Sequence, residues 1–369
     1  MGTLNQLQEN ISKPAEKKKV SLSYHDQQLY AFLSKACTNI GQIDQDGWTP
    51  MHRAIEINKI EIVKLLIFKS NGADLNFTCL RGNTPLTYAI SKGNLDIIKL
   101  LVKSGADMNF EDKSRWIPLT KAIEAENIDI VKFLCEKGAD LNMKVSSGWT
   151  PIVKAVSKEN LEIIKLLIVK GADVNLSCEY GTPLTEAIEC DKIESVRLLI
   201  EKGADLNKTD PNGWTPVTNA IYKNNLNILQ LLIERGADVN FVDSFNWTPL
   251  IKAISTNKIE AVKVLIANGA NVNLGPVISP LSAAVYKNYF KIVKLLVENG
   301  ALINLHNSIG KTPFHSAILH KNMSIITYFL ENGANLISRT KNNNKNAIEL
   351  ALKKNQPIIM KKLLNHSFY

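Results

Sequence analysis

Residues 148–175 read GWTPIVKAVSKENLEIIKLLIVKGADVN, and each part of this stretch indicates a local structure. Thr150 is suited to cap a helix, and Pro151 fits the first helical position, where no backbone N–H is needed. Asn160 can cap a second helix, which carries an apolar stripe at helical spacing. The Lys-Gly pair at 170–171 ends that helix, because glycine adopts the left-handed conformation freely. The stretch therefore predicts a short helix, a turn, a longer helix and a loop.

The same pattern recurs along the 369-residue chain with a period of about 33 residues. A proline marks the start of each unit, and an alanine follows each proline by four residues. The prolines are Pro50, Pro85, Pro118, Pro151, Pro183, Pro216, Pro249, Pro280 and Pro313. A single unit cannot cover both sides of its apolar helices, whereas stacked neighbours can. The repeats therefore predict an array with one continuous core.

The pattern T-P-L-x-x-A followed by L-x-I-x-x-L-L-x-x-G-A-D-x-N resembles the ankyrin repeat. The resemblance implies an all-α solenoid of stacked helix-turn-helix units joined by hairpin-like loops. It covers residues 44–337, as nine repeats. Residues 338–369 resemble a diverged, basic C-terminal capping repeat, and residues 21–43 resemble an N-terminal capping helix region. Residues 1–20 are expected to be disordered.

All five tryptophans of the chain occupy one slot of the repeat, two residues before its proline. They are Trp48, Trp116, Trp149, Trp214 and Trp247. By resemblance, this slot lies at an exposed loop tip where ankyrin proteins contact partners, and Trp is enriched in interface hot spots. The alternative is that each Trp lies flat on the neighbouring loop as structural filler. The scaffold does not require Trp, because four repeats lack it.

A second column of candidates directly precedes the repeat alanine on each first helix. The ankyrin family often has a buried leucine here, whereas this chain has mostly polar residues, so we expect the column to face the binding groove. Lysines beside the tryptophans predict an acidic partner segment, and solvated lysines without a binding role are the alternative. The candidates in this column are Arg53, Tyr88, Lys121, Lys154 and Lys252, and Tyr222 and Tyr286 are added at helix ends.

Motifs for catalysis or metal binding are missing from the sequence. It contains no dinucleotide fingerprint, no P-loop and no HExxH pair. The chain is therefore predicted to be non-catalytic, with no cofactor and no metal.

Charge and cysteine usage limit the environment of the chain. Of the net charge of +9, residues 338–369 contribute +6, so the middle is near neutral, which argues against a continuous nucleic-acid track. Five cysteines without CxxC spacing indicate free thiols in a reducing compartment. No apolar run is long enough to cross a membrane. An intracellular, cytoplasmic location is expected, with the nucleus or delivery into a host cell left open.

The sequence as a whole predicts a monomeric protein-interaction module or scaffold. Its partner is expected to be an extended or acidic protein segment, held in the concave groove that the resemblance implies. Two alternatives stay open. One is a substrate adaptor or host-directed effector of an intracellular parasite or bacterium, and the other is a nucleic-acid-associated regulator that uses the basic C-terminal tail.

Overall fold

The structure is a computed structural model that describes residues 43–70, 75–307, 310–341 and 344–366. Within these ranges the chain forms twenty α-helices and no β-strand, which confirms the predicted all-α class. The predictions of disorder for residues 1–20 and of a capping helix before residue 43 lie outside the described residues. The chain divides into two compact units, Met1–Glu179 and Tyr180–Tyr369, which are described separately.

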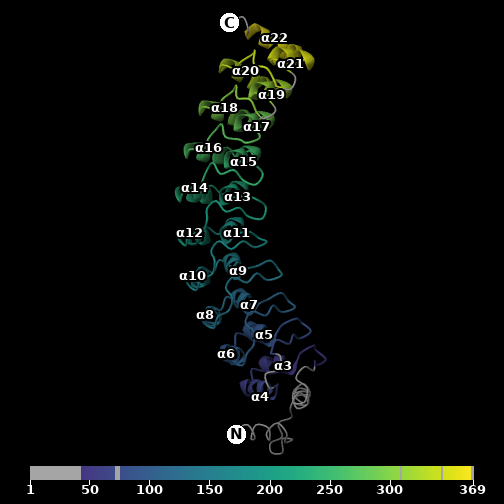
Figure 1. Ribbon diagram of the computed structural model, residues 1–369, viewed down its shortest axis with the longest axis vertical. Helices are drawn as coiled ribbons and strands as arrows, with labels where there is room; N and C mark the ends of the chain where they lie inside the picture. Colours follow the sequence, from purple (N-terminus) through teal and green to yellow (C-terminus); the bar gives the residue numbers. More distant parts are fainter. Residues whose placement is uncertain (1–42, 71–74, 308–309, 342–343, 367–369) are drawn as a thin grey trace, which may run out of the picture. The chain divides into compact units, whose positions relative to one another are not determined.

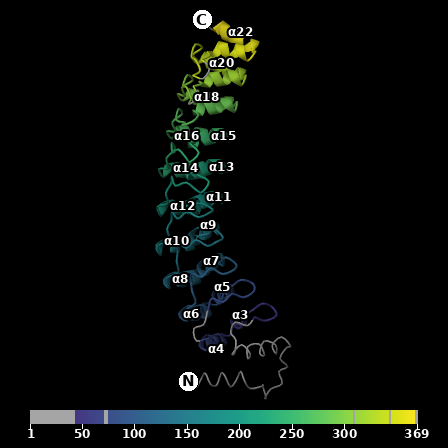
Figure 2. The ribbon, with the colours of Figure 1, turned by 45° about the vertical axis from the view of Figure 1, so that its right-hand side comes forward.

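The described residues of unit 1 form four helix pairs. The first helices α3, α5, α7 and α9 pack against one another in sequence, and each packs against its own second helix. Figures 1 and 2 show the loops projecting on the side of the first helices, away from the second helices. The pairs are α3 (Pro50–Glu56) with α4 (Ile60–Ser70), α5 (Pro85–Lys92) with α6 (Leu95–Lys103), α7 (Pro118–Glu124) with α8 (Ile128–Glu136), and α9 (Pro151–Ser157) with α10 (Leu161–Val169).

The described residues of unit 2 form six pairs, and their first helices likewise pack in sequence. The last pair is formed by the degraded terminal repeat, in which Ala347 replaces the proline and Asn346 caps the helix. The pairs are α11 (Pro183–Glu189) with α12 (Ile193–Glu201), α13 (Pro216–Lys223) with α14 (Leu226–Glu234), α15 (Pro249–Ser255) with α16 (Ile259–Ala267), α17 (Pro280–Tyr286) with α18 (Phe290–Glu298), α19 (Pro313–Leu319) with α20 (Met323–Glu331), and α21 (Ala347–Lys353) with α22 (Pro357–His366).

The helix boundaries follow the local signals of the sequence. Thr150 caps α9 by accepting a hydrogen bond from a backbone N–H, and Pro151 is the first helical residue. Asn160 caps α10 in the same way. Ala155 is fully buried, which allows the first helices to approach closely. Each loop thus delivers its tip to the same side of its helix pair.

The asparagine of each A-D-x-N turn ties neighbouring repeats together. The Oδ1 atom of Asn142 accepts a hydrogen bond from the backbone N–H of Asp173 at 2.9 Å, and Asn109 does the same with Asp140. In unit 2, Asn207 accepts from the N–H of Asp238 at 3.0 Å. These bonds fix the register of successive loops, so the loop tips recur at regular intervals within each unit.

Candidate functional site

The tryptophan slot is held by backbone bonds to the residue four positions before it. Asp210 and Trp214 exchange two bonds of 2.9 Å, one from the Asp210 N–H to the Trp214 carbonyl and one from the Trp214 N–H to Asp210 Oδ1. The same pair of bonds links Asp44 with Trp48, Asp112 with Trp116, and Asp243 with Trp247. For Trp149, the residue four positions before it is Val145, whose N–H donates to the Trp149 carbonyl at 3.0 Å. The sequence prediction missed this role, although D-x-x-x-W occurs four times.

The residue before each tryptophan adopts the left-handed conformation. Gly213 has φ +78°, and a Cβ atom there would lie 2.8 Å from the Cβ atom of Ser244 in the next loop. Arg115 and Asn246 adopt the same conformation at φ 64° and 61°. Asparagine accepts this conformation more readily than most residues, whereas arginine is strained in it. Glycine in Gly-Trp-Thr-Pro therefore serves the loop, and only the tryptophan side chain is left for another role.

Trp48 in unit 1 is buried, so the prediction of an exposed loop-tip ring is wrong for this residue. Its side chain is 7% exposed. The Tyr88 ring from the next repeat lies 4.6 Å from it, the His52 ring lies 5.7 Å away, and the Arg81 guanidinium lies 4.7 Å above it. Tyr88 is buried with it, which corrects the expectation that this side chain faces a partner. The two rings cover each other across the repeat boundary and act as structural filler.

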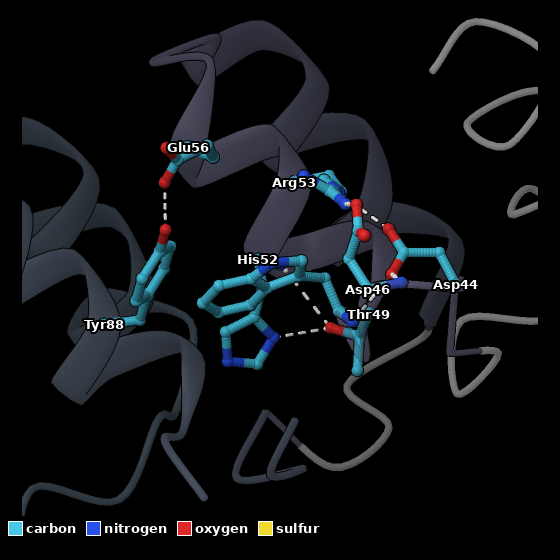
Figure 3. Close-up of polar contacts among 8 residues, drawn as sticks. Asp44, Asp46, Thr49, His52, Arg53, Glu56 and Tyr88 are labelled. Atoms are coloured by element: carbon cyan, nitrogen blue, oxygen red, sulfur yellow. Dashed lines mark hydrogen bonds and ion pairs between the residues drawn. The ribbon is translucent and has the colours of Figure 1, made fainter. Parts of the chain in front are cut away.

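Polar groups around this buried pair bond to one another (Figure 3). Arg53 donates from Nε to Asp44 Oδ2 at 2.6 Å and from its terminal nitrogen to Asp46. The Tyr88 hydroxyl donates to Glu56. Burial and this bond raise the pKa of Tyr88. Arg53 and Tyr88 are therefore engaged within the chain rather than offered to a partner.

His52 is a further structural residue of this region. Its ring bonds the Thr49 hydroxyl at 2.7 Å (Figure 3), and its Nε2 atom bonds the Asn83 carbonyl of the next loop at 3.0 Å. Burial lowers the pKa of His52 to about 4, and the backbone bonds only partly oppose this shift. The imidazole is therefore neutral at pH 7, where it joins two repeats.

Loop tryptophans and lysines gather in the middle of unit 1. The Lys154 Nζ atom lies 5.2 Å from the ring centroid of Trp116 and 5.1 Å from that of Trp149, and Lys121 Nζ lies 5.0 Å from the Trp116 ring. These distances allow cation–π attraction. Both rings are half-buried. We call these residues, together with Glu124 and Lys158, the unit 1 cluster.

Glu124, at the end of α7, forms ion pairs with two lysines of the unit 1 cluster. Its carboxylate lies 2.6 Å from Lys154 Nζ and 2.9 Å from Lys158 Nζ. Burial would raise the pKa of Glu124, but the hydrogen bonds from Lys154 and Lys158 outweigh burial and hold that pKa below its ordinary value. The ammonium of Lys154 thus lies near two tryptophan rings and is paired with a carboxylate.

The corresponding cluster in unit 2 is built around Lys252. Its Nζ atom lies 3.4 Å from the ring centroid of Trp214, 5.2 Å from that of Tyr222 and 5.7 Å from that of Trp247. The lysine side chain is buried at 6% exposure, whereas Tyr222 is 51% and Trp247 is 37% exposed. We call these four residues the unit 2 cluster. It presents aromatic surface to solvent with a cation directly behind it.

Lys252 forms no ion pair among the residues that the structure describes. Burial lowers its pKa, and the more distant charges of Asp243 and Asp210 oppose this only partly. One Asp243 oxygen accepts the N–H of Trp247. Asp210 accepts the N–H of Trp214 and also the side-chain amide of Asn219 at 3.0 Å. Both carboxylates thus bond the loops, and the buried position of Lys252 argues against the alternative of a solvated lysine without a binding role.

Tyr286 is the one remaining candidate, and it lies outside both clusters. It stands at the end of α17, is 61% exposed, and contacts the His320 ring edge-on at 5.0 Å. Among the described residues, no group of three or more His, Cys, Asp and Glu side chains is placed to hold a metal. A search of the same residues found no helix with the length and apolar character needed to span a membrane.

Stacked helix pairs, regular loops and paired asparagine turns define a helical repeat protein. Ankyrin-repeat family models match residues 46–79, 67–145, 141–210, 206–275 and 281–368. The chain belongs to the ankyrin repeat family. Ankyrin repeats are generally protein–protein interaction modules, and proteins built from them are typically non-catalytic.

Curated relatives match only part of the chain. It is 33% identical over 93 residues to "Interferon antagonist OPG039" of Monkeypox virus, covering 23% of this chain and 32% of that protein. It is 30% identical over 87 residues to "Probable 26S proteasome regulatory subunit p28" of Saccharomyces cerevisiae, covering 23% of this chain and 38% of that protein. The matches thus span about a third of the length of these relatives.

A solved structure supports the fold. The ankyrin repeat domain of Bcl-3, described as a unique member of the IkappaB family, superimposes with a TM-score of 0.55 at 26% sequence identity. The match covers 59% of this chain and 98% of that domain. The similarity confirms the ankyrin fold predicted from the repeat pattern.

Proposed function

We propose that the chain binds a segment of a partner protein on the side of its first helices and loop tips. The observation that carries this proposal is the repeated pairing of a lysine with two loop tryptophans, once in each unit. Such surfaces combine large, rigid contact area with a positive charge, and both are typical of interface hot spots. The family's general role in protein binding supports the same function.

The proposed contact residues are the aromatic residues of the two clusters and the lysines that lie over their rings. In unit 1 they are Trp116, Lys121, Trp149 and Lys154, and in unit 2 they are Trp214, Tyr222, Trp247 and Lys252. Trp48 and Tyr88 are left out because their rings are packed against each other across the repeat boundary, and Arg53 is left out because it is paired with Asp44. Scattered exposed apolar residues are normal on a protein surface, but exposed aromatics gathered around a cation indicate a binding surface.

A substrate adaptor or host-directed effector remains the second candidate. Similarity over 93 residues to a viral protein named as an interferon antagonist favours it, because an antagonist of interferon acts on a host. In this case the bound segment would belong to a host protein, and the same two clusters would contact it.

The proposed function can be tested by affinity capture from a lysate of the native cell. We expect the wild-type chain to recover partners that Trp116→Ala/Trp149→Ala and Trp214→Ala/Trp247→Ala recover at least about tenfold less, since hot-spot truncations cost 2 kcal/mol or more. Matched controls remove apolar side chains that are exposed elsewhere, as in Val169→Ala and Ile358→Ala. Identical partners in identical amounts with both folded double variants would refute the proposed function.

A further inference from the structure

Lys154 and Lys252 occupy equivalent positions but have different surroundings. Each is the third residue after the proline of its first helix, and each ammonium contacts two loop tryptophans. The sixth residue after the proline of the preceding repeat differs between the two. For Lys154 this residue is Glu124, and for Lys252 it is Tyr222. The unit 2 cluster is therefore the unit 1 cluster with its carboxylate replaced by a neutral ring.

This replacement leaves the Lys252 ammonium without an anionic hydrogen-bond acceptor. A lysine ammonium has three N–H donors, and aromatic faces attract its charge but do not accept these bonds well. Removing a charge from water without a paired acceptor is costly. The charges of Asp243 and Asp210 act on Lys252 from beyond ion-pair distance, and Lys252 pairs with no carboxylate among the described residues.

We propose that the bound partner supplies this acceptor, as an aspartate or glutamate side chain that pairs with Lys252. Glu124 shows the arrangement within the same molecule, with its carboxylate 2.6 Å from Lys154. Lys252 is 6% exposed, so its flexible side chain moves outward between Tyr222 and Trp247 to reach the partner. The inference rests on the proposed function and specifies the partner's chemistry.

The exposed rings indicate which kind of partner residue lies next to that acid. Tyr222 and Trp247 offer apolar surface on either side of the emerging ammonium, so an apolar partner residue beside the acid would be covered by them. Lys154 already has its carboxylate, so its ammonium does not need an acid from the partner. Of the two lysines that each contact two loop tryptophans, Lys252 rather than Lys154 is thus assigned the recognition of a negative charge.

A displayed library of random 12-residue peptides, selected on the full chain, tests this inference. We expect the selected peptides to share an Asp or Glu beside an apolar residue. Replacing that acid by its amide should weaken binding to the wild type roughly 10- to 100-fold, the range expected for a charged hydrogen bond. The loss should be absent with Lys252→Met, which keeps an apolar chain among the rings.

Two further variants provide controls. Tyr222→Glu places a carboxylate where Glu124 stands in unit 1, so it should occupy Lys252 and weaken the acidic peptides by a similar factor. Lys263→Met, which removes an exposed lysine of unit 2 outside both clusters, should leave the preference for the acid unchanged. Selected peptides without an acid, or an amide penalty that persists in Lys252→Met, would overturn the inference.

The outcomes separate this inference from the proposed function. If Trp214→Ala/Trp247→Ala abolishes peptide binding while Lys252→Met and Tyr222→Glu bind as the wild type does, the function stands and the inference fails. If no peptide is selected, or the tryptophan variants bind unchanged, both fail.

Discussion

In unit 1, Trp48 is covered and Lys154 is ion-paired within the chain, whereas in the described part of unit 2 Trp247 is partly exposed and Lys252 has no ion-pair partner. Trp48 is covered by Tyr88, and Lys154 is paired with Glu124. In unit 2, Trp247 stays 37% exposed, and only the more distant charges of Asp243 and Asp210 act on Lys252. Identical residue types at identical repeat positions thus differ in role, because one neighbouring residue decides whether the group is satisfied internally.

The largest expected effect separates a structural tryptophan from a surface one. Trp48→Ala should lower the free energy of unfolding by about 3–5 kcal/mol, the usual cost of removing a buried aromatic ring. Trp247→Ala should cost about 1 kcal/mol or less, because its ring is partly in solvent. Urea denaturation followed by circular dichroism measures both, and equal losses would contradict the contrast between the units.

Removing the carboxylate of the unit 1 cluster should have a smaller effect. Glu124→Gln leaves Lys154 and Lys158 without their shared anion, and we expect a loss of about 1 kcal/mol, because the pairs are partly exposed and screened. The matched change in unit 2, Tyr222→Phe, removes no charge and should change stability by less than about 0.5 kcal/mol. Denaturation at low and high salt checks both variants, and only the first should depend on salt.

Acid should remove the same contribution from unit 1. The pKa of Glu124 is lowered in the folded chain, so its ion pairs stabilise the fold above the ordinary pKa of 4.5, and this is lost as pH falls through the folded pKa. The stability difference between wild type and Glu124→Gln should therefore shrink below about pH 4.5. Unfolding measured from pH 7 to pH 3.5 tests this, and a constant difference would exclude the charge as its cause.

The smallest effect should come from building the missing pair in unit 2. Tyr222→Glu should stabilise the chain by about 0.5 kcal/mol relative to Tyr222→Gln, a control of equal shape without charge. It should also raise the pKa of Lys252, whose ammonium would gain a carboxylate. Nuclear magnetic resonance of the lysine Nζ atoms would report that shift, and an unchanged pKa would mean that the new carboxylate does not reach Lys252.

The helices could be predicted from the sequence because their signals are local. Thr150, Pro151 and Asn160 act within three residues of their own positions, so the pattern alone places α9 and α10. The exposure of Trp48 could not be predicted in this way, since its cover comes from Arg81 and Tyr88 of the next repeat.

The ion pairs between repeats are harder to predict from the sequence than the helices, but easier than the exposure of Trp48. Aligning the repeats in register would have placed Glu56 beside Lys92 and Glu189 beside Lys223, and both pairs form at 2.8 Å. The same alignment would have placed Glu124 beside Lys158, and this pair forms at 2.9 Å. Such pairs are visible only when neighbouring repeats are compared position by position, because their members are more than 30 residues apart along the chain.

The hydrogen bonds that hold the tryptophan slot affect how the sequences of such repeats can diverge by mutation. Where the slot is Asn83 or Lys311 instead, its carbonyl still accepts the N–H of the residue four positions before it, at 3.0 and 2.9 Å. The loop therefore forms whatever side chain the slot carries. Where the slot's side chain is partly exposed, as at Trp247, a mutation can alter what the surface recognises at little cost to folding, so copied repeats can diverge in specificity while inheriting one framework.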